Sequence, residues 1–277
     1  MKTILVPTDF SNNANNALRY ASAFAQETRS KLVLLNVYTP SIGGYNMIRG
    51  IIAEETALAK GQIKKQMIKL CDKYVKSSCS TLVEIGSPVN EIIGSSKINK
   101  ANIIIMGTHG ASGLKRILFG SNTAGVISKS AMPVLAVPQR YRFKKIKTIV
   151  YASDLKNTIN ELQRIISIVK PLNATIEILN LNYGWDKNAD KMKLLERKIK
   201  SLSYKKIKLV EQKANIEQTM LEQIKKYLKK RKPEILVMLP EDKAWFDNLF
   251  ISSKTEELAN QLKLPLLAIR KAIVKSN

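Results

Sequence analysis

The chain has 277 residues, more than one typical domain, and suits two compact units of roughly 140 residues each. Its apolar fraction of 45% and charged fraction of 25% are ordinary for a globular protein and argue against disorder. The formal net charge of +24 raises the possibility of a nucleic-acid partner. However, the basic residues are spread over both halves without stacking aromatic residues or a nucleic-acid motif, so solvated helix faces explain them better.

Targeting and thiol chemistry add little to this outline. Cys71 and Cys79 are the only cysteines, too few for a disulfide framework and without a histidine at metal spacing. We expect both to be reduced thiols, and we expect no metal site. The first residues enter a strand directly, and no apolar stretch approaches the roughly 20 residues that span a bilayer. These features predict a cytoplasmic protein with no membrane partner.

The pattern of apolar residues in the first half alternates between strand-like and helix-like segments. Short apolar runs indicate buried strands, and spacings of three and four indicate helices. In chain order, the patterns predict a strand at 2–7, an amphipathic helix at 14–25, a strand at 32–37, helices at 54–76 and 88–97, a strand at 103–106, a helix at 123–130 and a strand at 133–137.

The second half repeats the first in the same order. Residues 147–155 (KTIVYASDL) match residues 2–10 (KTILVPTDF), and strand-like runs recur at 176–181, 235–238 and 264–269. Such a repeat predicts two tandem α/β domains, each an open twisted parallel sheet of the Rossmann-like type. We place them at 1–140 and 141–277, joined by a short basic hinge at 139–145.

One loop carries most of the chemistry. The strand at 103–106 leads into Gly107-Thr108-His109-Gly110, then nine residues, then Gly120-Ser121 and a helix. Glycines allow backbone N–H groups to approach phosphate oxygens, and the following helix presents its positive end. Because ligands bind beyond the carboxyl ends of parallel strands, this loop and the loop around Asp9 should face one pocket.

This Gly-x-x-Gly, nine residues, Gly-Ser pattern resembles the ATP-binding branch of the universal stress protein family, as do Val6-Pro7-Thr8-Asp9 and Pro133-Val134. The resemblance covers residues 1–138 well and 146–271 in outline. It implies an adenine nucleotide alpha-hydrolase-like fold and bound ATP or AMP, with Mg²⁺ as a further candidate. The nucleotide-binding residues that it implies are Pro7, Thr8, Asp9, Val37, Met106, Gly107, His109, Gly110, Gly120, Ser121, Asn122 and Thr123.

Within this set, the resemblance gives Asp9 a hydrogen bond to ribose or base and Val37 an apolar contact with adenine. Gly120 to Thr123 would hold the phosphates. Asp9 also suits the entry to the following helix, because Asp favours caps and turns. His109, the only histidine, would contribute backbone rather than catalysis.

No nucleophile and base, and no opposed pair of carboxylates, occurs at a recognisable spacing, so we expect no catalytic residues. The leading function is therefore a nucleotide-binding stress-response or regulatory protein. The alternatives are a slow ATPase and a basic module that binds nucleic acid or protein.

The second half has a different loop at the equivalent position, Leu239-Pro240-Glu241-Asp242. Proline lacks an amide donor, and two carboxylates would repel a phosphate. Gly120-Ser121 is replaced by Ile251-Ser252. We therefore expect a degenerate second domain, one nucleotide per chain, an unidentified protein partner, and either a pseudo-dimeric monomer or a homodimer.

Overall fold

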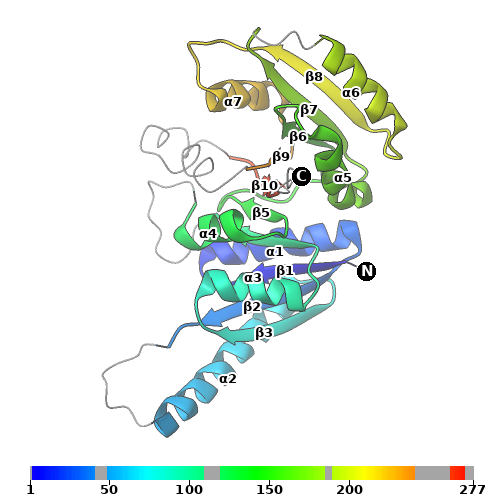
Figure 1. The fold of residues 1–277 in the computed structure, drawn as a ribbon. Coiled ribbons are helices and arrows are strands. Elements are labelled where there is room, and N and C mark those ends of the chain that lie inside the picture. Colours follow the sequence, from blue (N-terminus) through cyan, green and yellow to red (C-terminus); the bar gives the residue numbers. More distant parts are fainter. Residues whose placement is uncertain (1, 41–48, 109–118, 185–188, 241–262, 272–277) are drawn as a thin grey trace, which may run out of the picture. The chain divides into compact units, whose positions relative to one another are not determined.

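The computed structural model describes residues 2–40, 49–108, 119–184, 189–240 and 263–271. The chain divides into two compact units, Met1–Phe143 and Lys144–Asn277 (Figure 1). Each unit is an α/β structure with an all-parallel sheet, so the predicted fold class is confirmed.

The first unit is a doubly wound sheet with strand order β3-β2-β1-β4-β5. Helices α1 and α2 contact each other, as do α3 and α4, which places one pair on each face of the sheet. The elements are β1 (Thr3–Pro7), α1 (Asn12–Thr28), β2 (Lys31–Tyr38), α2 (Arg49–Tyr74), β3 (Cys79–Ile85), α3 (Pro88–Ile98), β4 (Ile103–Gly107), α4 (Ser121–Lys129) and β5 (Val134–Val137).

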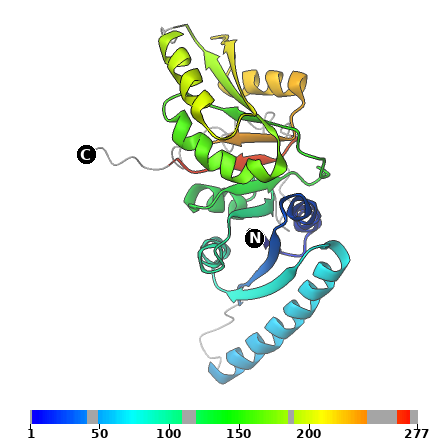
Figure 2. The same ribbon diagram turned by 90° about the vertical axis from the view of Figure 1, so that its right-hand side faces the viewer.

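The second unit repeats this order as β8-β7-β6-β9-β10. Figure 2 shows α5 and α6 on one face of its sheet and α7 on the other. The described elements are β6 (Thr148–Ala152), α5 (Thr158–Val169), the short 3-10 helix η1 (Lys170–Leu172), β7 (Thr175–Asn182), α6 (Ala189–Ser201), β8 (Ile207–Lys213), α7 (Met220–Arg231), β9 (Ile235–Met238) and β10 (Leu266–Ala268).

Burial explains why the central strands are easy to find in the sequence. Strands β4 and β9 are buried at every position, because helices cover both faces of the sheet. Edge strands β3 and β8 instead consist of half-buried and exposed side chains. Among the described residues, no helix is both long and apolar enough to cross a bilayer.

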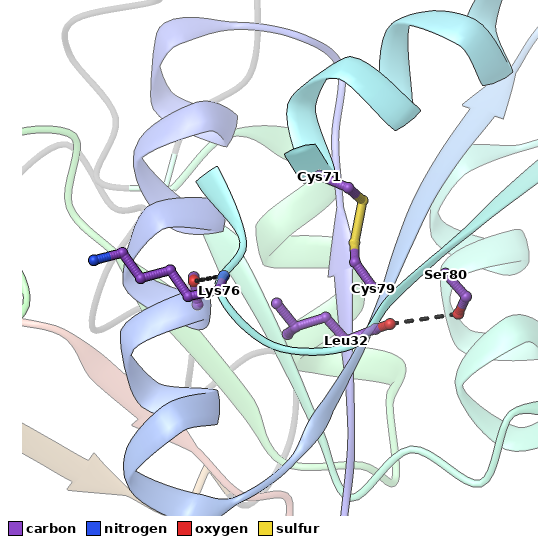
Figure 3. Close-up of a disulfide and its surroundings, with 6 residues drawn as sticks. Leu32, Cys71, Lys76, Cys79 and Ser80 are labelled. Carbon is purple, nitrogen blue, oxygen red and sulfur yellow. Dashed lines mark hydrogen bonds between the residues drawn. A yellow bond between two sulfur atoms is a disulfide. The ribbon is translucent and has the colours of Figure 1, made fainter. Parts of the chain in front are cut away.

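The two cysteines form a disulfide, so the expectation of reduced thiols is wrong (Figure 3). Cys71 lies in the last turn of α2 and Cys79 begins β3, and their Cα atoms are 6.1 Å apart. This separation falls within the range that a disulfide spans. The short return from α2 to the edge strand brings the two residues together, which their number and spacing in the sequence did not reveal.

Residues 138–143 fold back onto α1. The Tyr20 ring packs against the rings of Tyr141 and Phe143, with centroids 6.2 and 5.1 Å away. The Asn16 amide donates to the carbonyl oxygens of Pro138 and Tyr141, at 3.1 and 3.0 Å. Residues 141–143 therefore belong to the first compact unit.

Candidate functional site

A pocket of about 310 Å³ lies at the carboxyl edge of the first sheet, where strand order reverses between β1 and β4. It is lined by Pro7, Thr8, Asp9, Ala14, Leu35, Asn36, Val37, Pro88, Ile92, Met106, Gly107, Gly120, Ser121, Asn122 and Thr123. The structure places here every sequence-predicted site residue that it describes. His109 and Gly110 lie outside the described residues.

The loop after β1 is fixed by hydrogen bonds to β2. The Thr8 amide donates to the Leu35 carbonyl at 2.8 Å, and the Asn36 side-chain amide donates to the Thr8 carbonyl at 2.8 Å. Asn36 is buried, so this bond satisfies a polar group inside the sheet. The loop is thereby held in position beside the pocket.

Asp9 is exposed and its carboxylate accepts a hydrogen bond from the Ser11 amide at 3.0 Å. The cap of α1 is Ser11, whose hydroxyl oxygen accepts from the Ala14 amide at 3.1 Å. Asp9 therefore shapes the helix entry from two residues before the cap and also lines the pocket. A carboxylate has further acceptor positions when one is occupied.

Gly107 ends β4 where there is no room for a side chain. A Cβ atom here would lie 2.8 Å from Cγ of Asn13, which is buried in α1. The Thr123 hydroxyl donates to the Gly107 carbonyl at 2.8 Å, and the Gly120 amide donates to the Thr108 carbonyl at 2.7 Å. These two bonds hold the start of α4 against the end of β4.

Helix α4 begins at the pocket wall. Its first intrahelical bond runs from the Ala124 amide to the Gly120 carbonyl at 3.0 Å, so the amides of residues 121–123 precede the hydrogen-bonded ladder. No acidic residue lies in its first turn. The helix end therefore presents partial positive charge to the pocket. The hydroxyl hydrogen of Thr123 is already donated to Gly107, which leaves Ser121 as the hydroxyl donor on this side.

The remaining wall is mainly apolar, and sequence reasoning missed part of it. Val37 and Met106 were predicted, whereas Ala14, Leu35, Asn36, Pro88 and Ile92 were not. Two signals could have found them. Asn36 is the only polar residue in the apolar run from Leu32 to Val37. Pro88 begins a helix shortly after a strand, and the other pocket loops also connect a strand to a helix.

The second unit retains the loop tie but uses its aspartate differently. The Asn180 side-chain amide donates to the Ser153 carbonyl at 3.1 Å, as Asn36 does to Thr8. Asp154, the counterpart of Asp9, forms an ion pair with Lys271 at 2.9 Å. Burial by itself would raise the pKa of Asp154, but hydrogen bonds from Lys271 and the Lys156 amide outweigh it and hold that pKa below its usual value.

Only part of the predicted degenerate loop of the second unit, residues 239–242, lies within the described residues. Leu239 and Pro240 are buried at the end of β9. Glu241, Asp242, Ile251 and Ser252 lie outside the described residues, so the degenerate loop stays a prediction.

Comparison with known proteins gives consistent matches. The sequence model of the universal stress protein family matches residues 1–138. Universal stress protein MJ0577 of Methanocaldococcus jannaschii is 31% identical over 50% of this chain and 96% of its own length. Universal stress protein MJ0531 of the same organism is 32% identical over 49% of this chain and 81% of its own.

Among solved structures, the crystal structure of a universal stress protein from Archaeoglobus fulgidus covers 98% of both chains with a TM-score of 0.73. At 21% sequence identity, this structural similarity shows a shared fold. The match of the family model to residues 1–138 and the relatives at 31% and 32% identity extend that likeness to the sequence, and the chain belongs to the universal stress protein family.

Proposed function

We propose that the first unit binds an adenine nucleotide, ATP or AMP, and that the protein acts as a nucleotide-dependent stress-response regulator. The observation that carries the proposal is the two-ended character of the 310 Å³ pocket. Part of the lining offers the apolar side chains of Val37, Ile92 and Met106, and another part offers the first amides of α4. A purine base suits the first part and phosphates suit the second.

Asp9 supplies the polar contact between these two ends. It stands at the rim beside Pro7 and Thr8, where a carboxylate would accept hydrogen bonds from ribose hydroxyls. If Mg²⁺ accompanies the nucleotide, phosphates and water must provide most of its ligands, because Asp9 is the one carboxylate among the described lining residues.

We further propose one nucleotide per chain. The supporting observation is that the carboxylate of Asp154 in the second unit is engaged by Lys271, whereas Asp9 faces the pocket of the first unit. The second unit would then be a degenerate copy that contributes a surface for a protein partner.

The proposal is tested by identifying the nucleotide released from the purified, denatured protein by mass spectrometry. Calorimetric titration with ATP should then give a stoichiometry near one. A stoichiometry near two would show that the second unit also binds. Monitoring phosphate release in the same samples separates simple binding from slow hydrolysis.

Gly120 offers a charge test with a matched control. It caps α4 with φ −60° and ψ 157°, a conformation open to any residue, and Asp and Asn are both good N-caps. Gly120→Asp should keep the helix start while placing a carboxylate beside the phosphates. Gly120→Asn adds nearly the same volume without charge. We expect ATP affinity to fall at least tenfold more in the Asp variant. Equal affinities in the two variants would show that phosphates do not bind at α4.

A further inference from the structure

A second hollow, of about 350 Å³, lies in the first unit away from the nucleotide pocket and shares no lining residue with it. Three arginines and three amide side chains surround it, and its described lining includes no carboxylate. The lining residues are Asn12, Asn16, Arg19, Gln139, Arg140 and Arg142. We call it the arginine hollow.

The hollow is built by the return of residues 138–143 over α1. Asn16 is 3% exposed, and both hydrogens of its amide group are donated to carbonyl oxygens of this segment. Its Oδ1 accepts a hydrogen bond from the Arg142 guanidinium at 3.1 Å. Together with the Tyr20 packing described above, these bonds fix the backbone that carries Arg140 and Arg142. Asn16 is therefore a positioning residue.

Two of the arginines are held in place by neutral groups. Arg142 bonds to a neutral amide, and Arg19 donates to the Tyr74 hydroxyl at 3.0 Å and lies 4.4 Å from the centroid of its ring. Within the described part of the chain, neither is paired with a carboxylate, and nor is Arg140. Gathering three like charges at one surface is unfavourable unless an anion offsets their repulsion.

We propose that the arginine hollow binds a small polyphosphate anion, independently of the nucleotide pocket. A guanidinium group presents a planar fork of N–H donors that matches phosphate oxygens, and several forks at one hollow favour a ligand with more than one phosphate. The lining has guanidinium and amide groups but no apolar wall for a base. The guanidinium and amide groups would therefore recognise the phosphates rather than a base.

The test uses inorganic tripolyphosphate as the probe and calorimetric titration of the full chain at low ionic strength. The variant is Arg140→Gln with Arg142→Gln, which removes two exposed charges and keeps the Tyr141 and Phe143 contacts. The matched control is Lys64→Gln with Lys65→Gln, two exposed lysines of α2 outside the hollow. We expect affinity to fall at least about tenfold in the arginine variant and less than about twofold in the control.

Arg19→Gln gives an independent check, because Arg19 belongs to α1 rather than to the returning segment and should also weaken binding. Gly120→Asp repels phosphate from the start of α4 and so isolates the arginine hollow, and tripolyphosphate should still bind this variant. The proposal is overturned if the wild type does not bind tripolyphosphate or if the lysine control loses as much affinity as the arginine variant. It is also overturned if Gly120→Asp abolishes binding, because the anion then lies at the start of α4.

Discussion

The ion pair between Glu177 and Arg231 allows a quantitative test of how the second unit is held together. Glu177 is 3% exposed in β7, between the buried apolar residues Ile176 and Ile178. The Arg231 guanidinium binds it from the last turn of α7, with Nε 2.7 Å from Oε2 and Nη2 2.5 Å from Oε1. The Tyr227 hydroxyl adds a third donor at 3.2 Å.

Arg231→Met should remove the partner and leave a buried carboxylate. Breaking a buried pair in this way costs about 3–5 kcal/mol. Because the Arg231 side chain is 44% exposed, water can reach part of the vacated site, and we lower the expected loss to about 2–3 kcal/mol. Arg231→Lys, which keeps the charge but not the planar fork, should lie between the wild type and Arg231→Met.

The double variant Glu177→Leu with Arg231→Met provides the decisive comparison. Replacing a buried ion pair by apolar side chains is often neutral, so this variant should lie within about 1 kcal/mol of the wild type. If it loses as much stability as the single variants Glu177→Leu and Arg231→Met combined, the two residues are not coupled and the reasoning is refuted.

Urea unfolding followed by tryptophan fluorescence measures these effects. Both tryptophans, Trp185 and Trp245, belong to the second half of the sequence, so the signal reports on the second unit. With urea slopes of roughly 1–3 kcal/mol per molar, Arg231→Met should lower the midpoint by roughly 1–2 M.

The same ion pair predicts a pH dependence. The hydrogen bonds from Arg231 lower the pKa of Glu177 below its usual range. A lowered pKa means that the folded state favours the ionised carboxylate. Its contribution should be complete above roughly pH 4.3, the value in the unfolded chain, and decline as pH falls below it. Arg231→Met should flatten this decline in the urea midpoint.

Two further predictions concern the first unit. Gly107→Ala should lower the free energy of unfolding by about 1–3 kcal/mol and weaken ATP binding, because the new methyl group would overlap Asn13. Gly61→Ala, with open space around it, is the control and should not destabilise the protein. Thermal unfolding followed by circular dichroism measures stability, and calorimetric titration measures ATP binding. Reducing the Cys71–Cys79 bond, or Cys79→Ser, should cost about 2 kcal/mol for a loop this short. Identical melting with and without reductant would contradict the bond.

The sequence predicted the inner strands because helices cover both of their faces and leave nearly continuous apolar runs. It did not predict the edge strands β3 and β8, where polar residues, such as Lys208 and Glu211 in β8, interrupt the apolar ones. The disulfide was missed for a related reason. Its two cysteines meet only when α2 returns to an edge strand that the sequence did not reveal.

The candidate site divides in the same way. The residues around Asp9, Gly107 and Gly120 follow local glycine and turn patterns, so they could be named in advance. Pro88 and Ile92 reach the pocket only through the packing of α3 on the sheet, and that depends on strand order rather than on a local pattern. The pairing of Thr123 with the Gly107 carbonyl likewise requires the fold.

The asparagines Asn36 and Asn180 make the same tie in both units, although the aspartates beside them have different partners. The tie is thus a property of the scaffold and does not depend on the partner of the neighbouring aspartate. This independence is useful for protein design, because the loop after β6 is already held by Asn180 as the loop after β1 is held by Asn36. Grafting the first unit's Gly107-to-Thr123 sequence after β9, with Lys271 neutralised, would test whether a second pocket can be built by changing one loop and one charge.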